Sequence, residues 1–477
     1  MTDTLPRPIY RTVRRIPLSR TCRRAWRRDN QAEVDRCSVP RFQLFPRCSA
    51  GAGGCLLTLH SIFKVLNTFG VAVALPEAMQ RPCAKKMSGH SLGNTPIQRN
   101  MEASMINVTK TYLGDIDQFK RYVEGIYARG WLTNHGPLAK DLTERLKDYL
   151  GVKHIILTNN GTLALQIAYR ALGLSGSAVT TPFSFVATSS SLQWEGIRPV
   201  FADIDPDTWN ISPQHIKRSI AEDTTAIVGT HVFGNPCDVE AIQQIAREHK
   251  LKVIYDGAHA FAVRHAGQSV LNHGDISTLS FHATKLFHTI EGGAIITNDD
   301  ELARSAHLMC NFGISGVDRI DGIGINAKLN EFSAAMGLCI LDNIGNILEE
   351  RAQIAHCSTS ALESYLDLQK PQADSELNNS YYPVALRNEQ QLLTVRTALN
   401  LRKINPRRYF YPSLDTLEYL QPQPGQPVSR ALSERVLCLP IYPGLLKSEQ
   451  DLVIRTLIET CAVTDMDYPA CSAARVC

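Results

Sequence analysis

The sequence lacks a Cys-X-X-Cys pair, a repeat of fixed period and an uninterrupted apolar segment of membrane length. Without such a cysteine pair, zinc-binding and thioredoxin-like sites have no support, and we expect no metal site. Without a fixed period, solenoid and propeller architectures are not indicated. The apolar run near the start, residues 55–75, contains Lys64 and stops before Pro76, and an internal lysine is costly in a membrane helix. We therefore expect no membrane partner.

The overall composition is that of an ordinary globular protein. The 477 residues are 44% hydrophobic and 20% charged, which rules out a wholly disordered or fibrous chain. The formal charge of +4 is unevenly distributed, because residues 1–50 carry twelve Arg, no Lys and only four acidic residues. The chain from residue 105 onward is consequently net acidic, so the charge balance does not indicate a nucleic-acid partner.

The two ends of the chain differ in pattern from its middle. Residues 1–104 show neither a helical stripe of apolar residues nor strand alternation, and periodic sequence begins at Met105. We interpret residues 1–104 as a disordered or non-native extension, and we expect residues 461–477 to form an aperiodic tail. An Arg-rich organelle transit peptide and a membrane anchor over residues 55–75 are alternatives that the residues leave open.

The thirteen cysteines are scattered along the chain rather than grouped in close pairs. Scattered cysteines in a large chain fit a reducing compartment, where thiols are kept reduced. We therefore expect a cytoplasmic protein with buried thiols.

From residue 150 onward, short apolar segments alternate with helical patterns. The expected strands are 154–158, 178–181, 199–204, 226–232, 251–255, 276–281 and 294–297. We expect Ser212 and Asp238 each to cap a helix, and Asp299 and Asp300 to open another. Strands separated by helices of ten or more residues favour a mainly parallel sheet covered on both faces. A helical stretch over 328–366 and a mixed segment after it indicate a smaller α+β domain.

Two local features lie at the ends of expected strands. Asn160, Gly161 and Thr162 lie between a strand and a helix, where glycine permits close approach and the free helix N–H groups can bind an anion. Asp256 ends a strand at the carboxyl edge of the sheet, where ligands bind in open α/β folds. Taken singly, each has an ordinary structural explanation, a tight turn in one case and a helix cap in the other.

Two further features complete a pattern. Lys285 directly follows a strand among small and aromatic residues, and desolvation there would lower its pKa and make it a nucleophile, although a surface lysine is the commoner case. An aromatic residue of the segment 181–188 could cover a planar ring. An anion cradle, an aromatic cover, an acid and a lysine, in this order, are what pyridoxal phosphate (PLP) requires.

Nine segments between Met105 and Glu459 are distinctive: WLTNHGP, NNGTLALQIAY, TTPFSFVAT, PVFADIDPDTWNI, HVFGNPCDVE, VIYDGAHAFAV, LSFHATKLFHTIEGG, GINAKLNEFSAAMGL and RRYFYPSL. In these the chain resembles the nucleotide-sugar aminotransferases of the DegT/DnrJ/EryC/StrS family, which are fold-type-I PLP enzymes. It is most similar to members that aminate dTDP-4-keto-6-deoxy-D-glucose at C4. The resemblance implies a large PLP-binding α/β domain over 105–345, with a mainly parallel sheet covered by helices, and a small C-terminal α+β domain over 346–460.

The resemblance also implies an activity and a set of site residues. It implies a homodimer that moves an amino group from L-glutamate to C4 of a nucleotide-linked 4-keto-6-deoxyhexose, for surface polysaccharide such as O-antigen. Lys285 would bond to the cofactor aldehyde and shuttle a proton between substrate and cofactor carbons. The remaining implied contacts are Asp256 at the pyridine nitrogen, Phe185 on the ring, His259 near the ring hydroxyl, Gly161, Thr162 and Ser280 at the phosphate, and Asn326 at the phosphate of the neighbouring subunit.

Some details leave alternatives open. Related PLP-dependent sugar dehydratases carry His at the position of Lys285, so the lysine favours transamination. Ile325 and Lys328 stand where the family often has Tyr and Arg, so the contacts to sugar and donor are not assigned. Trp131, Thr133 and the segment RRYFYP are candidates for lining the sugar site, but no role is assigned to them. An aminotransferase for a 3-keto sugar nucleotide or a cyclitol, and a non-catalytic PLP-binding regulator, are the alternative functions.

Overall fold

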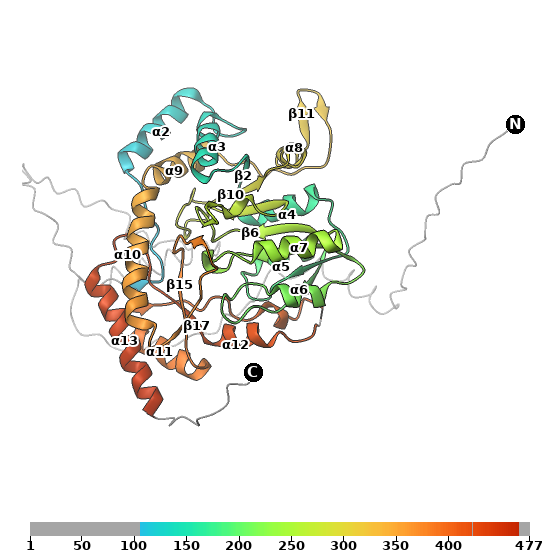
Figure 1. The fold of residues 1–477 in the computed structure, drawn as a ribbon. Helices are drawn as coiled ribbons and strands as arrows, with labels where there is room; N and C mark the ends of the chain where they lie inside the picture. Colours follow the sequence, from blue (N-terminus) through green and yellow to red (C-terminus); the bar gives the residue numbers. More distant parts are fainter. Residues whose placement is uncertain (1–104, 422, 467–477) are drawn as a thin grey trace, which may run out of the picture. The chain divides into compact units, whose positions relative to one another are not determined.

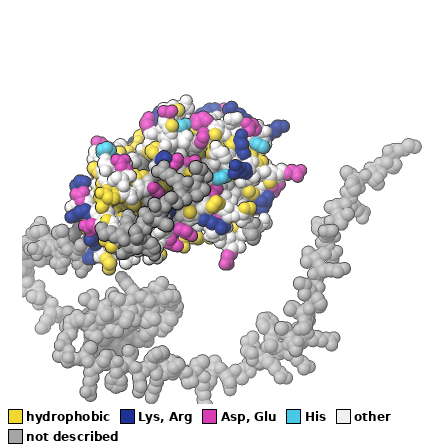
Figure 2. All heavy atoms as spheres, turned by 60° about the horizontal axis from the view of Figure 1, so that its bottom comes forward, with side chains coloured by type: hydrophobic (Ala, Val, Ile, Leu, Met, Phe, Trp, Pro, Cys, Tyr) yellow, Lys and Arg dark blue, Asp and Glu magenta, His cyan; other side chains and the backbone are white. Residues whose placement is uncertain are grey.

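The computed structural model describes residues 105–421 and 423–466 (Figure 1). The predicted extension 1–104, with its apolar run, and residues 467–477 of the predicted tail lie outside the described residues. No helix within the two described ranges is long and apolar enough to cross a membrane. On the face shown in Figure 2, basic and acidic side chains are interspersed wherever described residues are visible.

A seven-stranded sheet forms the centre of the described structure (Figure 1). In spatial order its strands are β2 (His154–Thr158), β10 (Gly293–Thr297), β9 (Ile276–Ser280), β6 (Lys252–Asp256), β5 (Thr224–Thr230), β3 (Ser177–Thr180) and β4 (Arg198–Phe201). The pairings from β9 to β4 are parallel, whereas β10 runs antiparallel to both β2 and β9. The mainly parallel sheet expected from the sequence is confirmed, and β10 is the exception.

Helices cover both faces of this sheet, because its strands are apolar on both faces. The helices of this part are α2 (Ile116–Arg129), α3 (Pro137–Leu150), α4 (Gly161–Ala171), α5 (Ala187–Trp194), α6 (Pro213–Ser219), α7 (Val239–His249), α8 (Asp300–Met309) and α9 (Glu331–Leu341). Buried side chains of α3, α7 and α9 pack on one face. Those of α4, α5 and α8 pack on the other face. The α/β class predicted from the sequence is therefore confirmed.

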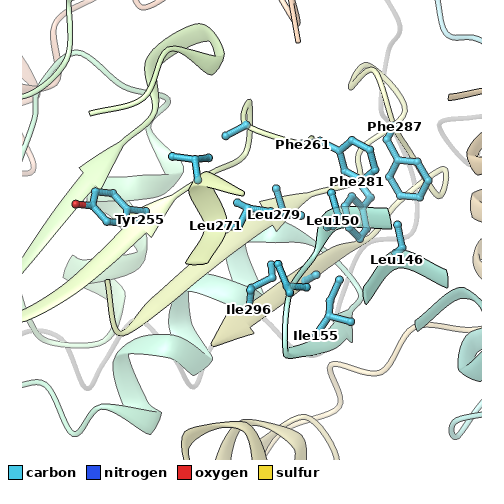
Figure 3. Close-up of a cluster of buried hydrophobic side chains, with 14 of the residues drawn as sticks. Leu146, Leu150, Ile155, Tyr255, Phe261, Leu271, Leu279, Phe281, Phe287 and Ile296 are labelled. Carbon is cyan, nitrogen blue, oxygen red and sulfur yellow. The ribbon is translucent and has the colours of Figure 1, made fainter. Parts of the chain in front are cut away.

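Figure 3 shows part of the core on the first of these faces. It draws Leu146 and Leu150 of α3, the strand residues Ile155, Tyr255, Leu279 and Ile296, and the neighbouring Phe261, Leu271, Phe281 and Phe287. The rings of Phe261 and Phe287 are stacked, with centroids 4.5 Å apart. This aromatic group packs beneath the loop that carries Lys285, so the loop rests on a close-packed base.

The three predicted helix starts are confirmed, but only two of them have a side-chain cap. The side chain of Asp238 accepts a hydrogen bond from the amide of Ala241, and that of Asp299 accepts two from the first turn of α8. Ser212 occupies the N-cap position of α6, but its side chain makes no capping hydrogen bond, since its hydroxyl donates to the side chain of Gln214 at 2.9 Å. Pro213 begins that helix, where its missing N–H costs nothing.

The C-terminal part has a core of its own, built from a small antiparallel sheet and three helices. Its elements are α10 (Ile344–Leu362), β13 (Asp367–Leu368), β15 (Tyr382–Ala385), α11 (Glu389–Leu401), β16 (Ile404–Asn405), α12 (Pro427–Arg435), β17 (Val436–Leu439) and α13 (Lys447–Met466). β1 (Ile106–Asn107) joins this part by pairing with β16. The domain boundary at residue 345 stays a prediction.

The structure differs from the sequence-based expectation in two regions. α2 and α3 lie before residue 150, where the sequence predicts no particular element, and α13 continues beyond Glu459. The start of the predicted tail is helical because Cys461 is only 4% exposed and belongs to the C-terminal core. The smaller strands of the structure are β7 (Arg264–His265), β8 (Gln268–Ser269), β14 (Ser375–Glu376) and the hairpin β11 (Ile314–Gly316) and β12 (Arg319–Ile320).

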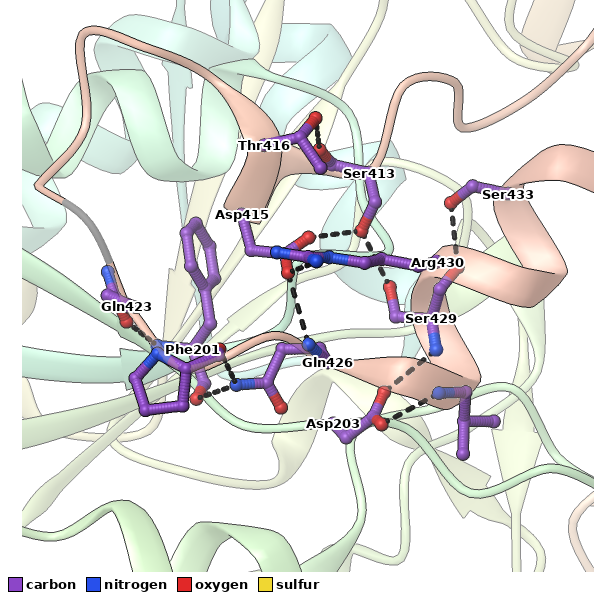
Figure 4. A network of polar contacts seen from close by, with 12 residues as sticks. Phe201, Asp203, Ser413, Asp415, Thr416, Gln423, Gln426, Ser429, Arg430 and Ser433 are labelled. Carbon is purple, nitrogen blue, oxygen red and sulfur yellow. Dashed lines mark hydrogen bonds and ion pairs between the residues drawn. The ribbon is translucent and has the colours of Figure 1, made fainter.

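A polar network attaches the segment 413–433 to the end of β4 (Figure 4). The carboxylate of Asp203 accepts hydrogen bonds from the amides of Val428 and Ser429 at the start of α12, at 2.9 and 2.8 Å. The buried carboxylate of Asp415 accepts from the hydroxyl of Ser413 and pairs with Arg430. The network fixes the chain that follows residues 407–412 against the carboxyl end of the sheet.

Candidate active site

The carboxyl ends of the parallel strands meet at one cavity of about 270 Å³. All of the predicted site residues except Asn326 line it: Gly161, Thr162, Phe185, Asp256, His259, Ser280 and Lys285. They come from the last residues of β6 and β9 and from the segments that follow β2, β3, β6 and β9. Parallel strands end at the same edge of a sheet, so side chains far apart in the sequence converge there.

The turn after β2 forms a cradle for an anion. The side chain of Asn160 caps α4 by accepting from the amide of Leu163 at 2.8 Å. A Cβ on Gly161 would lie 3.0 Å from Cβ of Ser280, and one on Gly293 would lie 2.6 Å from the backbone of Asn160. The backbone therefore approaches the ends of β9 and β10 as closely as glycine allows, leaving the first N–H groups of α4 and the hydroxyl of Ser280 for a ligand.

Asp256 is held by a chain of hydroxyl groups. Its side chain is 5% exposed, and its Oδ2 accepts from Thr188 Oγ1 at 2.7 Å. Thr188 Oγ1 lies 2.8 Å from Ser184 Oγ, which lies 3.0 Å from Thr230 Oγ1. The amide of Ala258 donates to the other carboxylate oxygen at 3.1 Å. These contacts fix the carboxylate at the cavity wall, where it can pair with a cationic ring nitrogen.

Lys285 lies on the loop after β9, and its backbone amide donates to the carbonyl of His282 at 2.8 Å. The side chain is enclosed by protein and only partly exposed toward the cavity. Burial lowers the pKa of Lys285 to about 8, with Asp256 raising it and Arg407 lowering it further. Near neutral pH a fraction of the amine is therefore unprotonated and nucleophilic.

His259 is fixed by its ring and by its Nδ1 atom. Nδ1 accepts from the amide of Phe233 at 3.2 Å, and the ring lies parallel to those of Phe233 and Phe410. Burial, followed by the charge of Lys285, holds the pKa of His259 well below its ordinary value. The neutral ring therefore carries its proton on Nε2, because Nδ1 is an acceptor.

Phe185 lines the cavity with 51% of its surface exposed. A phenyl ring this exposed is available to cover a planar ligand. Its neighbour Phe183 is fully buried and packs edge-on against Phe233 and Phe410. The two aromatic residues of this segment thus divide into a core residue and a cavity residue.

The cavity also contains residues that the sequence analysis missed or left without a role. Arg407, Tyr409 and Phe410 come from the segment RRYFYP, and the guanidinium of Arg407 lies 4.4 Å from the ring centroid of Tyr409. Tyr381 lies beneath Lys285, whose Nζ is 5.7 Å from its ring centroid. His282, Thr284 and Glu291 line the cavity too. For Arg407 the available signal was the distinctive segment itself, whereas Tyr381 carries no local signal.

Asn326 does not line the cavity of its own chain. It is exposed, and its Oδ1 accepts from Lys328 Nζ at 2.8 Å. The same segment is joined to the end of β2, because the amide of Asn159 donates to the carbonyl of Ala327 at 2.8 Å. Its predicted contact with the phosphate of a neighbouring subunit stays a prediction. The indole N–H of Trp131 donates a hydrogen bond to the backbone carbonyl of Thr133, and neither residue lines the cavity.

Comparisons with known proteins agree on one family. The DegT/DnrJ/EryC1/StrS aminotransferase family model matches residues 115–458. The chain is 40% identical over 361 residues to a dTDP-4-amino-4,6-dideoxy-D-glucose transaminase of Shigella dysenteriae, a match covering 74% of this chain and 98% of that protein. It is 35% identical over 365 residues to the Escherichia coli protein of the same name, covering 74% and 98%. The crystal structure of DesI in the presence of its TDP-sugar product matches with a TM-score of 0.71 and 29% identity, over 76% of this chain and 95% of that one.

Proposed function

Because the chain belongs to the DegT/DnrJ/EryC1/StrS aminotransferase family, as its motifs predicted, we propose that it aminates C4 of dTDP-4-dehydro-6-deoxy-D-glucose with L-glutamate as the donor. The family makes the chain an aminotransferase with pyridoxal phosphate as its cofactor. The acceptor is the one indicated by the two transaminases that the chain matches over most of its length. The observation that carries the proposal is the convergence of Lys285, Asp256 and the Asn160–Thr162 turn on one cavity.

The residues of the cavity fit pyridoxal phosphate. When bound, this cofactor supplies an aldehyde that takes up the amino group and a ring that accepts electrons. The turn with Gly161 and Thr162, together with Ser280, offers N–H and hydroxyl donors for its phosphate, in a cradle that a side chain at 161 or 293 would fill. Asp256 would hold a proton on the ring nitrogen, and Phe185 would cover the ring. The donor set thus matches each part of the cofactor.

Lys285 would act as both nucleophile and proton carrier. With a pKa of about 8, its amine changes protonation state readily near neutral pH. Nζ can therefore remove a proton from one substrate carbon and return it elsewhere. His259, with its proton on Nε2, would donate toward the ring hydroxyl of the cofactor, while its stacking partners prevent the imidazole from turning.

The wider context belongs to the same proposal. We expect a homodimer in which Asn326 of each subunit contributes to the other's phosphate site, and a product used in surface polysaccharide such as O-antigen. We also expect a cytoplasmic enzyme. None of the cysteines in the described ranges forms a disulfide, and all of them but Cys357 are buried, which supports a reducing compartment.

The test begins with the absorbance spectrum of the purified, cofactor-loaded protein before and after L-glutamate is added. We expect the aldehyde form of the cofactor to be replaced by its amine form. The protein carrying the amine form of the cofactor is then mixed separately with dTDP-4-dehydro-6-deoxy-D-glucose, a 3-keto sugar nucleotide and a keto-cyclitol. The products are identified by mass spectrometry. Amination of either of the last two in preference to the first would contradict the proposed acceptor, and no response to any donor would favour a non-catalytic role.

A further inference from the structure

The turn 288–291 precedes β10, and both ring nitrogens of its first residue, His288, form hydrogen bonds. His288 is 1% exposed, its Nε2 donates to the carbonyl of Tyr112 at 2.7 Å, and its Nδ1 accepts from the amide of Ile290 at 3.2 Å. The hydroxyl of Thr289 donates to the carbonyl of Glu291 at 2.9 Å. Residues 288–291 are therefore held in one conformation, which sets the direction of the next side chain.

This conformation is strained. Ile290 has a φ of 69°, in the left-handed region that β-branched residues avoid. Its side chain is 45% exposed, so the free energy gained by burying it does not offset the strain. A Cβ on Gly292 would lie 2.0 Å from the hydroxyl of Thr289, so the turn tolerates no side chain there. Strain of this kind persists where the surroundings impose it, and it is concentrated at functional sites.

The strained turn places Glu291 at the cavity that holds Lys285. The carboxylate faces His282, with Oε1 of Glu291 lying 3.5 Å from Nε2. The amide of Thr284 donates to Nδ1 of His282 at 3.3 Å, and the hydroxyl of Thr284 lies 2.8 Å from the same atom. With Nδ1 accepting from the amide, the ring proton lies on Nε2 and points to Glu291, which orients the carboxylate.

Glu291 retains capacity to accept further hydrogen bonds. Its side chain is 61% exposed, and in the described part of the chain His282 is the recorded partner of its carboxylate. A carboxylate accepts about four hydrogen bonds, so most of its acceptor sites are available to a ligand of the cavity that it lines. The cationic groups at this cavity, Lys285 and Arg407, are suited to anionic parts of a substrate. The carboxylate of Glu291 is suited instead to neutral groups that donate hydrogen bonds.

We propose that Glu291, held by its strained turn and by His282, accepts a hydrogen bond from a hydroxyl of the keto sugar beside the reacting carbon. It is thus a specificity-determining residue for the acceptor and not for the donor. Glutamate brings two carboxylates, which a third carboxylate repels, whereas a hexose brings hydroxyl groups. The inference rests on the proposed function, because it takes the acceptor to be a sugar.

The first test compares Glu291→Gln with the wild type in the two half-reactions measured separately. Glutamine keeps the shape of the side chain but not the charge, and hydrogen bonds to charged groups are the stronger ones. We expect KM for the keto sugar nucleotide to rise at least about tenfold, which corresponds to about 1.4 kcal/mol. The glutamate half-reaction should be unchanged or faster. Glu222→Gln, at an exposed site outside the cavity, is the matched control and should alter neither half-reaction.

The second test identifies the hydroxyl. The dissociation constants of dTDP-4-amino-4,6-dideoxy-D-glucose and of its 2-deoxy and 3-deoxy analogues are measured by calorimetry with wild type and Glu291→Gln. The hydroxyl beside C4 is the one on C3, so the 3-deoxy analogue should bind the wild type at least about tenfold more weakly than the parent, and the variant should not distinguish the two. A loss of affinity confined to the 2-deoxy analogue would contradict the assignment. If the variant lost the same affinity for every ligand, or if only its glutamate half-reaction became slower, the assignment would be overturned. A wild type that aminates no keto sugar at all would instead overturn the proposed function.

Discussion

The polar groups on the two faces of β6 differ in whether they have hydrogen-bond partners. On the cavity face, Asp256 accepts hydrogen bonds from Thr188 and Ala258, and the hydroxyl chain continues through Ser184. On the other face, the hydroxyl of Tyr255 is buried without a partner in the described structure, as is Nε2 of the stacked His231. The difference suggests a division of tasks: the carboxylate on the cavity side is held in place by hydrogen bonds, whereas the unpartnered groups on the other face make the fold sensitive to pH.

The largest expected effect lies on the cavity face. Lys285→Ala removes the nucleophile and proton carrier from a partly exposed loop position, so the fold should persist while transamination is lost. We expect turnover to fall by roughly 10²–10⁴-fold or more, the range for a lost acid–base group. The measurement is steady-state turnover together with the denaturant midpoint. Full turnover by this variant would remove Lys285 from the mechanism, and a shifted midpoint would break the division between the two faces.

The second effect belongs to the opposite face and depends on pH. Burial lowers the pKa of His231 to about 3, with smaller contributions from His273 and His265, and burial lowers the pKa of His273 as well. A folded pKa below the unfolded value of about 6.5 means that stability is complete above pH 6.5 and is lost as pH falls. We expect a loss of about 1.4 kcal/mol per pH unit from His231 below that point.

Urea midpoints at pH 7.5, 6.0 and 5.0 measure this loss. His231→Asn is the informative variant, because an amide oxygen can replace Nδ1 as the acceptor for the amide of Cys237 but does not titrate. The variant should show a shallower dependence on pH than the wild type. An identical slope would show that other groups, such as His135 with its pKa lowered to about 4 by burial, dominate the acid response.

The third effect tests whether the hydroxyl groups of Thr188 and Ser184 hold the carboxylate of Asp256 in place. Thr188→Val keeps the shape of the side chain but removes the hydrogen bond to Oδ2 and the contact with Ser184. A lost hydrogen bond to a charged group corresponds to about 1.5–3 kcal/mol. We expect turnover to fall by roughly tenfold or more and its pH profile to shift, because a less firmly held carboxylate holds the ring proton less well. A change in stability with no shift of the pH profile would make Thr188 a structural residue only.

The site was predictable from the sequence where its residues follow strand ends, and unpredictable where tertiary contacts decide. Asp256 and Lys285 each follow an apolar strand, and parallel strands bring such positions together. Thr188 and Tyr381 carry no such signal, because their places at the site depend on packing between distant segments. The antiparallel direction of β10 is likewise invisible in its apolar pattern, since periodicity does not indicate strand direction.

The smallest expected effect is also the most direct comparison of the two faces. Tyr255→Phe removes only a hydroxyl that is buried without a recorded partner, and Figure 3 shows that ring within the hydrophobic cluster. An unpaired buried hydroxyl costs about 1–3 kcal/mol relative to a bonded one, so its removal should leave stability unchanged or raise it by about 1 kcal/mol. Turnover should not change, although residue 255 adjoins Asp256. A clear loss of stability would mean that this hydroxyl has a partner such as a buried water, and the face behind the strand would then be as fully bonded as the cavity face.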